Sequence, residues 1–329
     1  MQKRLLLQEY IDGILSGNRV ILSRAITLIE SRLPQDKALA QDLLEQLLPH
    51  TGQSIRIGIT GVPGVGKSTF IEVFGKSITA QNKKIAVLAI DPTSQITKGS
   101  IMGDKTRMEE LAHDPLAYIR PSPAGSTLGG VANKTRETIL LCEAAGYQII
   151  IIETVGVGQS ETVVKEMVDF FLLLMLAGAG DELQGIKRGI IEMADAIVIT
   201  KADGDNLQSS KNARLEYLNA LHLYPASHNN WQTPVLTCSA LNNIGIIEIW
   251  ETIENYVQKM QLSGFWEQNR KKQNVEWLYT FIRQTLEEDF YNNPVVKDKF
   301  SGIKESILSG KMLPIQGAKE LLERSKDAN

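Results

Sequence analysis

The sequence has too few cysteines and histidines for a disulfide-stabilised protein or a His/Cys metal centre, and its apolar runs are too short for a membrane protein. It contains 2 cysteines, Cys142 and Cys238, and 4 histidines, and neither type shows the close spacing of metal ligands. Two isolated cysteines are typical of reduced thiols in a cytoplasmic protein. The strongly apolar run at residues 170–176 is too short to cross a bilayer and is typical of a buried strand.

The sequence also lacks a dominant charge. Its 35 basic and 38 acidic residues give a formal net charge of −3, which predicts neither a nucleic-acid binder nor a membrane-surface binder. Residues 1–4 are followed by only three leucines, which is not the pattern of a signal peptide, so we expect a cytoplasmic protein. With 329 residues, 43% of them hydrophobic, the chain can form one large domain with appendages or two domains.

Three regions follow from the hydrophobic pattern. Residues 1–50 carry three apolar stripes at helical spacing and predict an N-terminal helical extension. Over residues 51–262, short β-rich runs alternate with helical patterns, which predicts βαβ units and a mainly parallel sheet covered on both faces. Helical patterns return over residues 263–329, broken at Pro294 and Pro314. The expected strands lie at residues 55–60, 85–90, 117–119, 148–153, 170–177, 196–200 and 235–238.

A complete Walker A sequence, Gly-x-x-x-x-Gly-Lys-Ser, lies between the first expected strand and the helical pattern after it. Glycines in such a loop let main-chain N–H groups turn toward phosphate oxygens, and the helix N-terminus adds its positive dipole end. We expect Lys67 to reach the β- and γ-phosphates and Ser68 to bind Mg²⁺. The predicted phosphate-binding residues are Gly61, Val62, Pro63, Gly64, Val65, Gly66, Lys67, Ser68 and Thr69.

Acidic residues end two of the expected strands. Asp91 follows the run at residues 85–90, and Glu153 closes the run at residues 148–153. Ligand sites in such sheets lie at the carboxyl ends of the strands, and carboxylates are standard Mg²⁺ ligands. We therefore expect both acids at a metal site, with a helix N-cap as the alternative for each. Gly156 is placed to present its N–H to the γ-phosphate.

The strand at residues 196–200 runs into Thr-Lys-Ala-Asp, a variant of the guanine-recognition sequence whose commonest form begins with Asn. The Asp203 carboxylate can accept hydrogen bonds from guanine N1–H and the 2-amino group, which adenine lacks in that arrangement. We expect the Lys201 stem to cover the base, and a main-chain N–H after the last strand to donate to guanine O6; the alternative is a solvated loop. The predicted base-binding residues are Thr200, Lys201, Asp203, Ser239, Ala240 and Leu241.

Several longer strings resemble one family, the MeaB/ArgK GTPases of the SIMIBI branch of P-loop proteins, which are bacterial relatives of the human MMAA protein. The resemblance covers almost the whole chain. It rests on Asp91-Pro92 and on the strings at residues 61–68, 99–104, 119–123, 127–130, 153–160 and 183–189.

The resemblance implies a GTPase chaperone for an adenosylcobalamin-dependent mutase, typically methylmalonyl-CoA mutase. Proteins of this family gate cofactor loading and protect the mutase from inactivation. They are homodimers, and the resemblance makes residues 263–329 the dimerisation arm beside a P-loop GTPase domain at residues 51–262.

The resemblance also implies a metal shell and three switch segments. Ser68, Asp91, Asp104 and Glu153 match the residues around Mg²⁺. Asp104 matches a first switch, residues 153–159 a second, and residues 180–187 a third that rearranges with the partner.

The group that positions the attacking water is left open by the sequence. Gln159 lies three residues beyond Gly156 rather than directly after it, so Asp91 or Asp104 is an alternative. A role for Gln159 in protein contacts alone is an equal alternative. The predicted catalytic residues are Lys67, Asp91, Asp104, Glu153 and Gln159.

Three residues depart from the family pattern: Thr200 replaces the usual Asn, Lys98 replaces a Gly, and Asn133 replaces a basic residue. Thr200 keeps a hydroxyl but lacks the amide, so we expect weaker base binding. Two other functional classes remain open, a metallochaperone GTPase and a kinase linked to lysine/arginine/ornithine transport. The first would need a His/Cys cluster, and the second an acceptor pocket that the sequence does not show.

Overall fold

The computed structural model describes residues 4–31, 33–90, 108–120, 128–154, 160–178, 188–222 and 229–326. Its internal contacts divide the chain into two compact units, Met1–Gln273 and Asn274–Asn329. Each unit has its own hydrophobic core and is described by itself. Within the described residues, no helix combines the length and the apolar character needed to cross a membrane.

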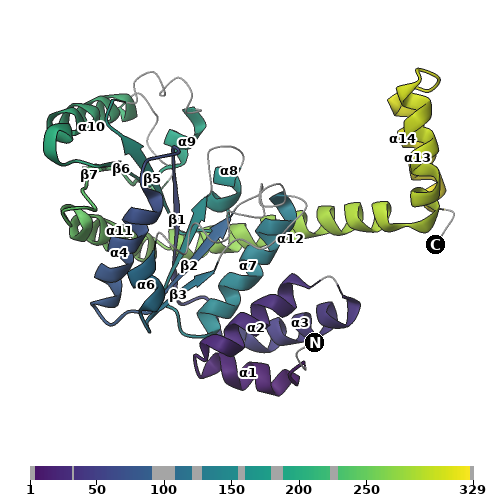
Figure 1. Ribbon diagram of the computed structural model, residues 1–329, viewed down its shortest axis with the longest axis horizontal. Helices are drawn as coiled ribbons and strands as arrows, with labels where there is room; N and C mark the ends of the chain where they lie inside the picture. Colours follow the sequence, from purple (N-terminus) through teal and green to yellow (C-terminus); the bar gives the residue numbers. More distant parts are fainter. Residues whose placement is uncertain are drawn as a thin grey trace. The chain divides into compact units, whose positions relative to one another are not determined.

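The first unit is built on a seven-stranded sheet in the order β3-β2-β4-β1-β5-β6-β7, with every neighbouring pair parallel (Figure 1). The expected parallel α/β fold is confirmed, and each strand lies within one residue of its predicted ends. Parallel strands buried on both faces read as continuous apolar runs, which is why these strands stand out in the sequence. The strands are β1 Ile55–Gly61, β2 Ile85–Ile90, β3 Ala117–Arg120, β4 Ile149–Thr154, β5 Phe170–Leu176, β6 Ala196–Thr200 and β7 Val235–Thr237.

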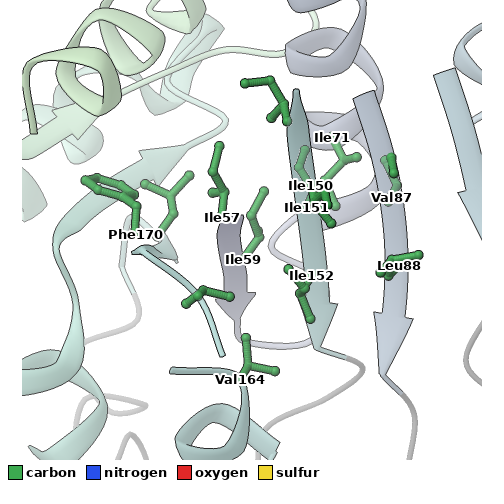
Figure 2. Packing of buried hydrophobic residues seen from close by; sticks show 14 of the residues in the cluster. Ile57, Ile59, Ile71, Val87, Leu88, Ile150, Ile151, Ile152, Val164 and Phe170 are labelled. Atoms are coloured by element: carbon green, nitrogen blue, oxygen red, sulfur yellow. The ribbon is translucent and has the colours of Figure 1, made fainter. Parts of the chain in front are cut away.

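The core of the first unit lies along β1, β2, β4 and β5 (Figure 2). Ile150, Ile151 and Ile152 of β4 are fully buried between β1 and β2. Gly58 of β1 lets helix α8, Ser160–Lys165, approach the sheet, because a Cβ there would come within 2.8 Å of Val164. The central strands are therefore held firmly where their carboxyl ends form the candidate site.

Helices flank this sheet in two contacting groups. Helix α4 contacts α6 and α11, while α8 contacts α7 and α9; α10 packs on β6 and β7. The short 3-10 turns η1 and η3 span Leu48–His50 and Gly204–Asn206. The helices are α4 Lys67–Thr79, α6 Glu109–His113, α7 Leu128–Ala144, α9 Arg188–Met193, α10 Leu207–Leu221 and α11 Ile246–Leu262.

The N-terminal helices share the core of the first unit. Helices α1, Leu7–Leu15, α2, Arg19–Glu30, and α3, Pro34–Leu47, contact one another and α7. Asn18 caps α2 by accepting hydrogen bonds from Val20 N and Ile21 N. Polar bonds also join α2 to β3, including Arg120 Nη2 to Glu30 Oε2 at 2.7 Å. The predicted extension at residues 1–50 is thus helical and forms part of the first unit.

Helix α12, Phe265–Asn292, begins in the first unit and continues into the second. Its first turns are fixed by Arg270, whose Nε and Nη2 donate to Asp169 Oδ1 at 2.8 Å and Oδ2 at 2.6 Å. Arg270 also donates to the carbonyls of Gly52 and Ser54. Gln273 Nε2 donates to Val168 O at 2.7 Å. These bonds attach the start of α12 to the amino ends of β1 and β5.

The second unit contains the rest of α12 and two further helices, α13 Pro294–Leu308 and α14 Pro314–Lys326. Pro294 and Pro314, which the sequence marks as breaks, are the first residues of these helices, where a missing N–H costs nothing. A small core of Val296, Ile303 and Leu321 holds α13 and α14 together.

Candidate nucleotide-binding site

The predicted phosphate loop connects β1 to α4 at the carboxyl edge of the sheet. Gly64 and Gly66 adopt left-handed conformations with φ of +79° and +90°, which glycine reaches without steric cost. At Gly61, a Cβ would overlap the carbonyl oxygen of Leu174 on β5. The glycines of the motif are thus required by the turn and by its close packing on the neighbouring strand.

Helix α4 presents its first turn to this loop. Its first intrahelical bond runs from Phe70 N to Gly66 O, so the N–H groups of Lys67, Ser68 and Thr69 lie ahead of it. Lys67 Nζ donates to Gly61 O at 2.8 Å, which folds the side chain back over the loop. The Ser68 side chain is at the same helix start and is buried. Main-chain donors, an ammonium group and a hydroxyl therefore lie together at the start of α4, and this donor chemistry suits phosphate oxygens.

Glu153 lies beside the phosphate loop, near the end of β4. It pairs in register with Ile59 of β1 and Ala89 of β2 and is 3% exposed. The next residue, Thr154, donates from Oγ1 to Thr60 Oγ1 at 2.8 Å, which ties the ends of β4 and β1 together. The Glu153 carboxylate therefore lies at the carboxyl edge of the sheet, where the sequence predicts it.

Only part of the predicted metal shell is described. Asp91, Asp104, Gly156 and Gln159 lie outside the described residues, although Asp91 directly follows the end of β2. Among the residues that are described, no three His, Cys, Asp or Glu side chains gather as a metal site. The Ser68 hydroxyl and the Glu153 carboxylate are hard oxygen donors at neighbouring element ends, and this donor chemistry fits Mg²⁺.

The predicted base loop contacts the phosphate loop directly. Thr200, the last residue of β6, donates from Oγ1 to Val65 O at 2.8 Å and to Met175 O at 3.3 Å. Lys201 Nζ donates to Gly64 O at 2.8 Å. The two loops, 135 residues apart in sequence, are therefore joined by side-chain hydrogen bonds.

Asp203 is held by the loop after β7. The hydroxyl of Ser239 donates to Asp203 Oδ2, and Asn242 N donates to Ser239 Oγ at 3.1 Å. Ala202 N donates to Cys238 O at 3.0 Å, so the main chains of the two loops are also joined. Ala240 and Leu241 continue the turn from Ser239. The two sequence segments predicted to bind the base thus lie side by side.

Cys238 is a packing residue in this loop rather than a reactive one. Burial, with a smaller contribution from the Asp203 carboxylate, raises the pKa of its thiol to about 12. At neutral pH the thiol is therefore protonated, and a protonated thiol is a poor nucleophile and a poor metal ligand. Cys142, in α7, is likewise buried and free of disulfide bonds.

Sequence reasoning missed two residues that shape the base loop. Asn206 Nδ2 donates to Lys201 O at 2.7 Å, and Gly245 turns the chain with φ +78° between Ser239 and α11. Lys201 itself has φ +54°, which is uncommon for a residue with a side chain. An Asn three positions after the recognition Asp, and a Gly before a helical pattern, were the available signals.

Comparison with protein families matches residues 22–295 to a model described as methylmalonyl Co-A mutase-associated GTPase MeaB. The chain is 46% identical over 321 residues to the GTPase ArgK of Escherichia coli (strain K12), covering 96% of each. It is 45% identical to the mitochondrial methylmalonic aciduria type A homolog of Mus musculus, covering 97% of this chain and 80% of that protein.

Among solved structures, the chain resembles the crystal structure of an LAO/AO transport system kinase. The TM-score is 0.75 at 39% sequence identity, and the match covers 98% of this chain and 100% of the other.

Proposed function

Because this chain belongs to the MeaB family of methylmalonyl-CoA mutase-associated GTPases, we propose that it binds GTP, hydrolyses it with Mg²⁺ and acts as a chaperone for an adenosylcobalamin-dependent mutase. The observation that carries the proposal is the set of hydrogen bonds that join the phosphate and base loops. Thr200 and Lys201 bond to main-chain carbonyls of the phosphate loop, and Ser239 holds Asp203 beside them.

Guanine recognition falls to Asp203. An Asp carboxylate accepts hydrogen bonds only, and guanine offers two adjacent donors, N1–H and the 2-amino group. Adenine in the same place would leave the carboxylate facing an acceptor nitrogen, which is unfavourable. The hydroxyl of Ser239 fixes the carboxylate from its other side, so it stays oriented for those donors.

In this proposal the phosphate loop, the start of α4 and the metal-binding residues bind the phosphates and support hydrolysis. The N–H groups at the start of α4 and the Lys67 ammonium bind and orient the phosphates, and Lys67 exchanges its bond to Gly61 O for phosphate oxygens. Ser68 and Glu153, with Asp91 and Asp104 as predicted, would hold Mg²⁺, which neutralises charge on the β- and γ-phosphates. Asp91, Asp104 or Gln159 positions the attacking water in this proposal.

The partner follows from the relatives. The family description names methylmalonyl-CoA mutase, and the mouse relative is named for methylmalonic aciduria. We propose that residues 180–187 contact the mutase and rearrange with it, and that residues 153–159 respond to the presence of the γ-phosphate. We also propose that the chain forms a homodimer through its second unit.

The first experiment compares GDP with ADP by calorimetry, and GTP with ATP in a hydrolysis assay. We expect GDP to bind at least about a hundredfold more tightly than ADP, because losing paired hydrogen bonds and facing like groups costs roughly 3 kcal/mol. Asp203→Asn should remove most of that preference, since an amide donor then faces guanine donors. Lys67→Ala should abolish turnover, because no other group replaces the ammonium at the phosphates.

Comparable affinity for GDP and ADP in the parent would contradict guanine specificity. One inorganic phosphate released for each GDP formed identifies a hydrolase, whereas phosphate transferred to an amino acid or protein would identify a kinase. Addition of methylmalonyl-CoA mutase should accelerate hydrolysis, and an unchanged rate would contradict the proposed partner.

A further inference from the structure

We propose that Asn206 is a positioning residue for guanine recognition: its side-chain amide holds the Lys201 main chain in the conformation that places Lys201 and Asp203. The proposal rests on the guanine specificity proposed above. It adds a residue outside the recognition sequence itself, at the junction of η3 and α10.

The backbone of Lys201 needs support. Its φ of +54° lies in the left-handed region, which costs a residue with a Cβ roughly 1–2 kcal/mol. Thr200 before it ends a buried strand, and Asp203 after it is extended with φ −143°. The left-handed residue Lys201 therefore lies between the end of β6 and the extended recognition residue Asp203.

Asn206 closes this turn with two bonds. Its Nδ2 donates to Lys201 O at 2.7 Å, and its main-chain N donates to Asp203 O at 3.0 Å. Helix α10 starts at the next residue and is fixed on the sheet by buried Ser210 and Ala213. The turn is thus braced against a helix that packs on β6 and β7.

The direction of the side-chain bond is what separates this arrangement from an ordinary helix cap. An Asn before a helix normally accepts a hydrogen bond from the second or third N–H of that helix. In α10, all of which is described, Asn206 makes no such side-chain bond. Its amide instead donates backward to the base loop, so the side chain stabilises the loop rather than the helix.

The braced conformation sets both recognition side chains. The Lys201 Nζ lies 2.8 Å from Gly64 O, and its Cε lies 3.9 Å from where a Cβ on Gly66 would stand. Asp203, two residues on, meets the hydroxyl of Ser239. If the turn relaxes, the Lys201 stem leaves the phosphate loop and the carboxylate rotates relative to the base.

The test measures affinity for GDP and for IDP, whose hypoxanthine base lacks the 2-amino group, in Asn206→Ala and Asn206→Asp. Neither variant can donate to Lys201 O, and Asp has nearly the size of Asn. We expect GDP affinity to fall about three- to tenfold, as for the loss of a typical hydrogen bond. IDP affinity should fall less, because IDP makes one bond fewer to Asp203, so the GDP/IDP ratio should narrow.

A matched control and a double variant complete the test. Asn212 lies on the exposed side of α10, where it accepts a bond from Gln208 at 3.1 Å, and Asn212→Ala and Asn212→Asp should leave both affinities unchanged. Lys201→Gly adopts a positive φ without cost, so adding Asn206→Ala to it should lower GDP affinity less than Asn206→Ala lowers it in the parent protein.

The outcomes separate the two claims. A parent protein with no preference for GDP over ADP contradicts guanine recognition itself. A guanine-selective parent whose Asn206 variants bind GDP normally overturns the role of Asn206. Equal losses for GDP and IDP in folded variants, judged by circular dichroism, also overturn it, because they indicate a general loosening of the site.

Discussion

Gly245 shows how a single residue shapes the base-binding edge. It has φ +78°, and a Cβ there would overlap Thr237 O and lie 3.1 Å from Cys238 Cα. Gly245→Ala therefore combines left-handed strain with a clash against the main chain that leads to Ser239. We expect a loss of unfolding free energy of about 2–4 kcal/mol in urea denaturation, together with weaker GDP binding.

Gly264 provides the matched control for this substitution. Its φ of +74° is almost the same, but no atom lies within 4 Å of where its Cβ would stand. Gly264→Ala should cost only the strain of about 1–2 kcal/mol and leave GDP affinity unchanged. Equal effects of the two substitutions on GDP affinity would mean that the clash at Thr237 does not shape the base loop.

At the scale of single residues, the sequence predicts where Lys67 and Asp203 lie in the fold, but not the contacts that hold the neighbouring loops in place. The positions of Lys67 and Asp203 can be predicted because their motifs follow strands, and the order of strands and helices places both motifs at the carboxyl edge of the sheet. The bond from Thr200 to Val65 O and the left-handed Lys201 are not readable, because both depend on how distant segments meet in the folded unit. The Thr200 hydroxyl makes this bond to Val65 O although Thr200 lacks the amide of the usual Asn.

At the scale of elements, two buried ion pairs lie at the amino ends of β1 and β5. Glu143 of α7 pairs with Arg56 of β1, and Arg270 of α12 pairs with Asp169, which directly precedes β5. Glu143 of α7 accepts from Arg56 Nε at 2.9 Å and from Ser54 Oγ at 2.6 Å. Burial alone would raise the pKa of the Glu143 carboxyl, but Arg56 and these hydrogen bonds bring it below its ordinary value. Arg270 donates to Ser54 O as well as to Asp169. Ser54 therefore bonds to one member of each ion pair.

Arg270→Met should break this network. The Asp169 side chain, 2% exposed, would remain buried without its guanidinium partner. Removing one partner of a buried pair typically costs about 3–5 kcal/mol, because the remaining charge keeps its desolvation penalty. We expect a loss of that size in the free energy of unfolding of the first unit, measured by urea denaturation followed by the fluorescence of Trp250 and Trp266.

Arg324→Met is the control for the same chemical change. Arg324 pairs with Glu320 at 3.4 Å on the surface of α14, and both side chains are well exposed. Exposed pairs at this spacing contribute at most about 0.5 kcal/mol. If Arg270→Met were equally mild, the start of α12 would be held by the packing of Phe265 and Trp266 on the core of the first unit rather than by the ion pair.

The sequence predicts the helices and strands well, but it does not predict which unit each helix packs on. Strand and helix ends agree closely because apolar runs, prolines and glycines mark them locally. Hydrophobic periodicity does not reveal which unit a helix packs on. Trp266, grouped with the arm by its sequence position, packs on the core of the first unit, and the division of the chain falls after Gln273 rather than at residue 263.

At the scale of the whole molecule, the second unit has far more apolar surface than its small core uses. Only three residues of this unit are buried hydrophobic residues among those described. Exposed apolar side chains instead follow α12 at helical spacing, with Val275 50%, Leu278 56%, Ile282 44% and Leu286 64% exposed. Such a stripe on one helix face is typical of a surface that packs against another protein.

We predict that this stripe forms a homodimer interface, with a mass in solution of twice 36.4 kDa by light scattering. Leu278→Glu with Ile282→Glu places two charges in the stripe, because residues four apart share a helix face, and should yield monomers. Thr280→Glu with Gln284→Glu adds the same charge to the opposite face and should stay dimeric. These substitutions leave Arg270 and Gln273 in place, so the first unit keeps its attachment to α12. GDP affinity should therefore be unchanged in both variants, and a Leu278→Glu, Ile282→Glu protein that remains dimeric would place the interface on another surface.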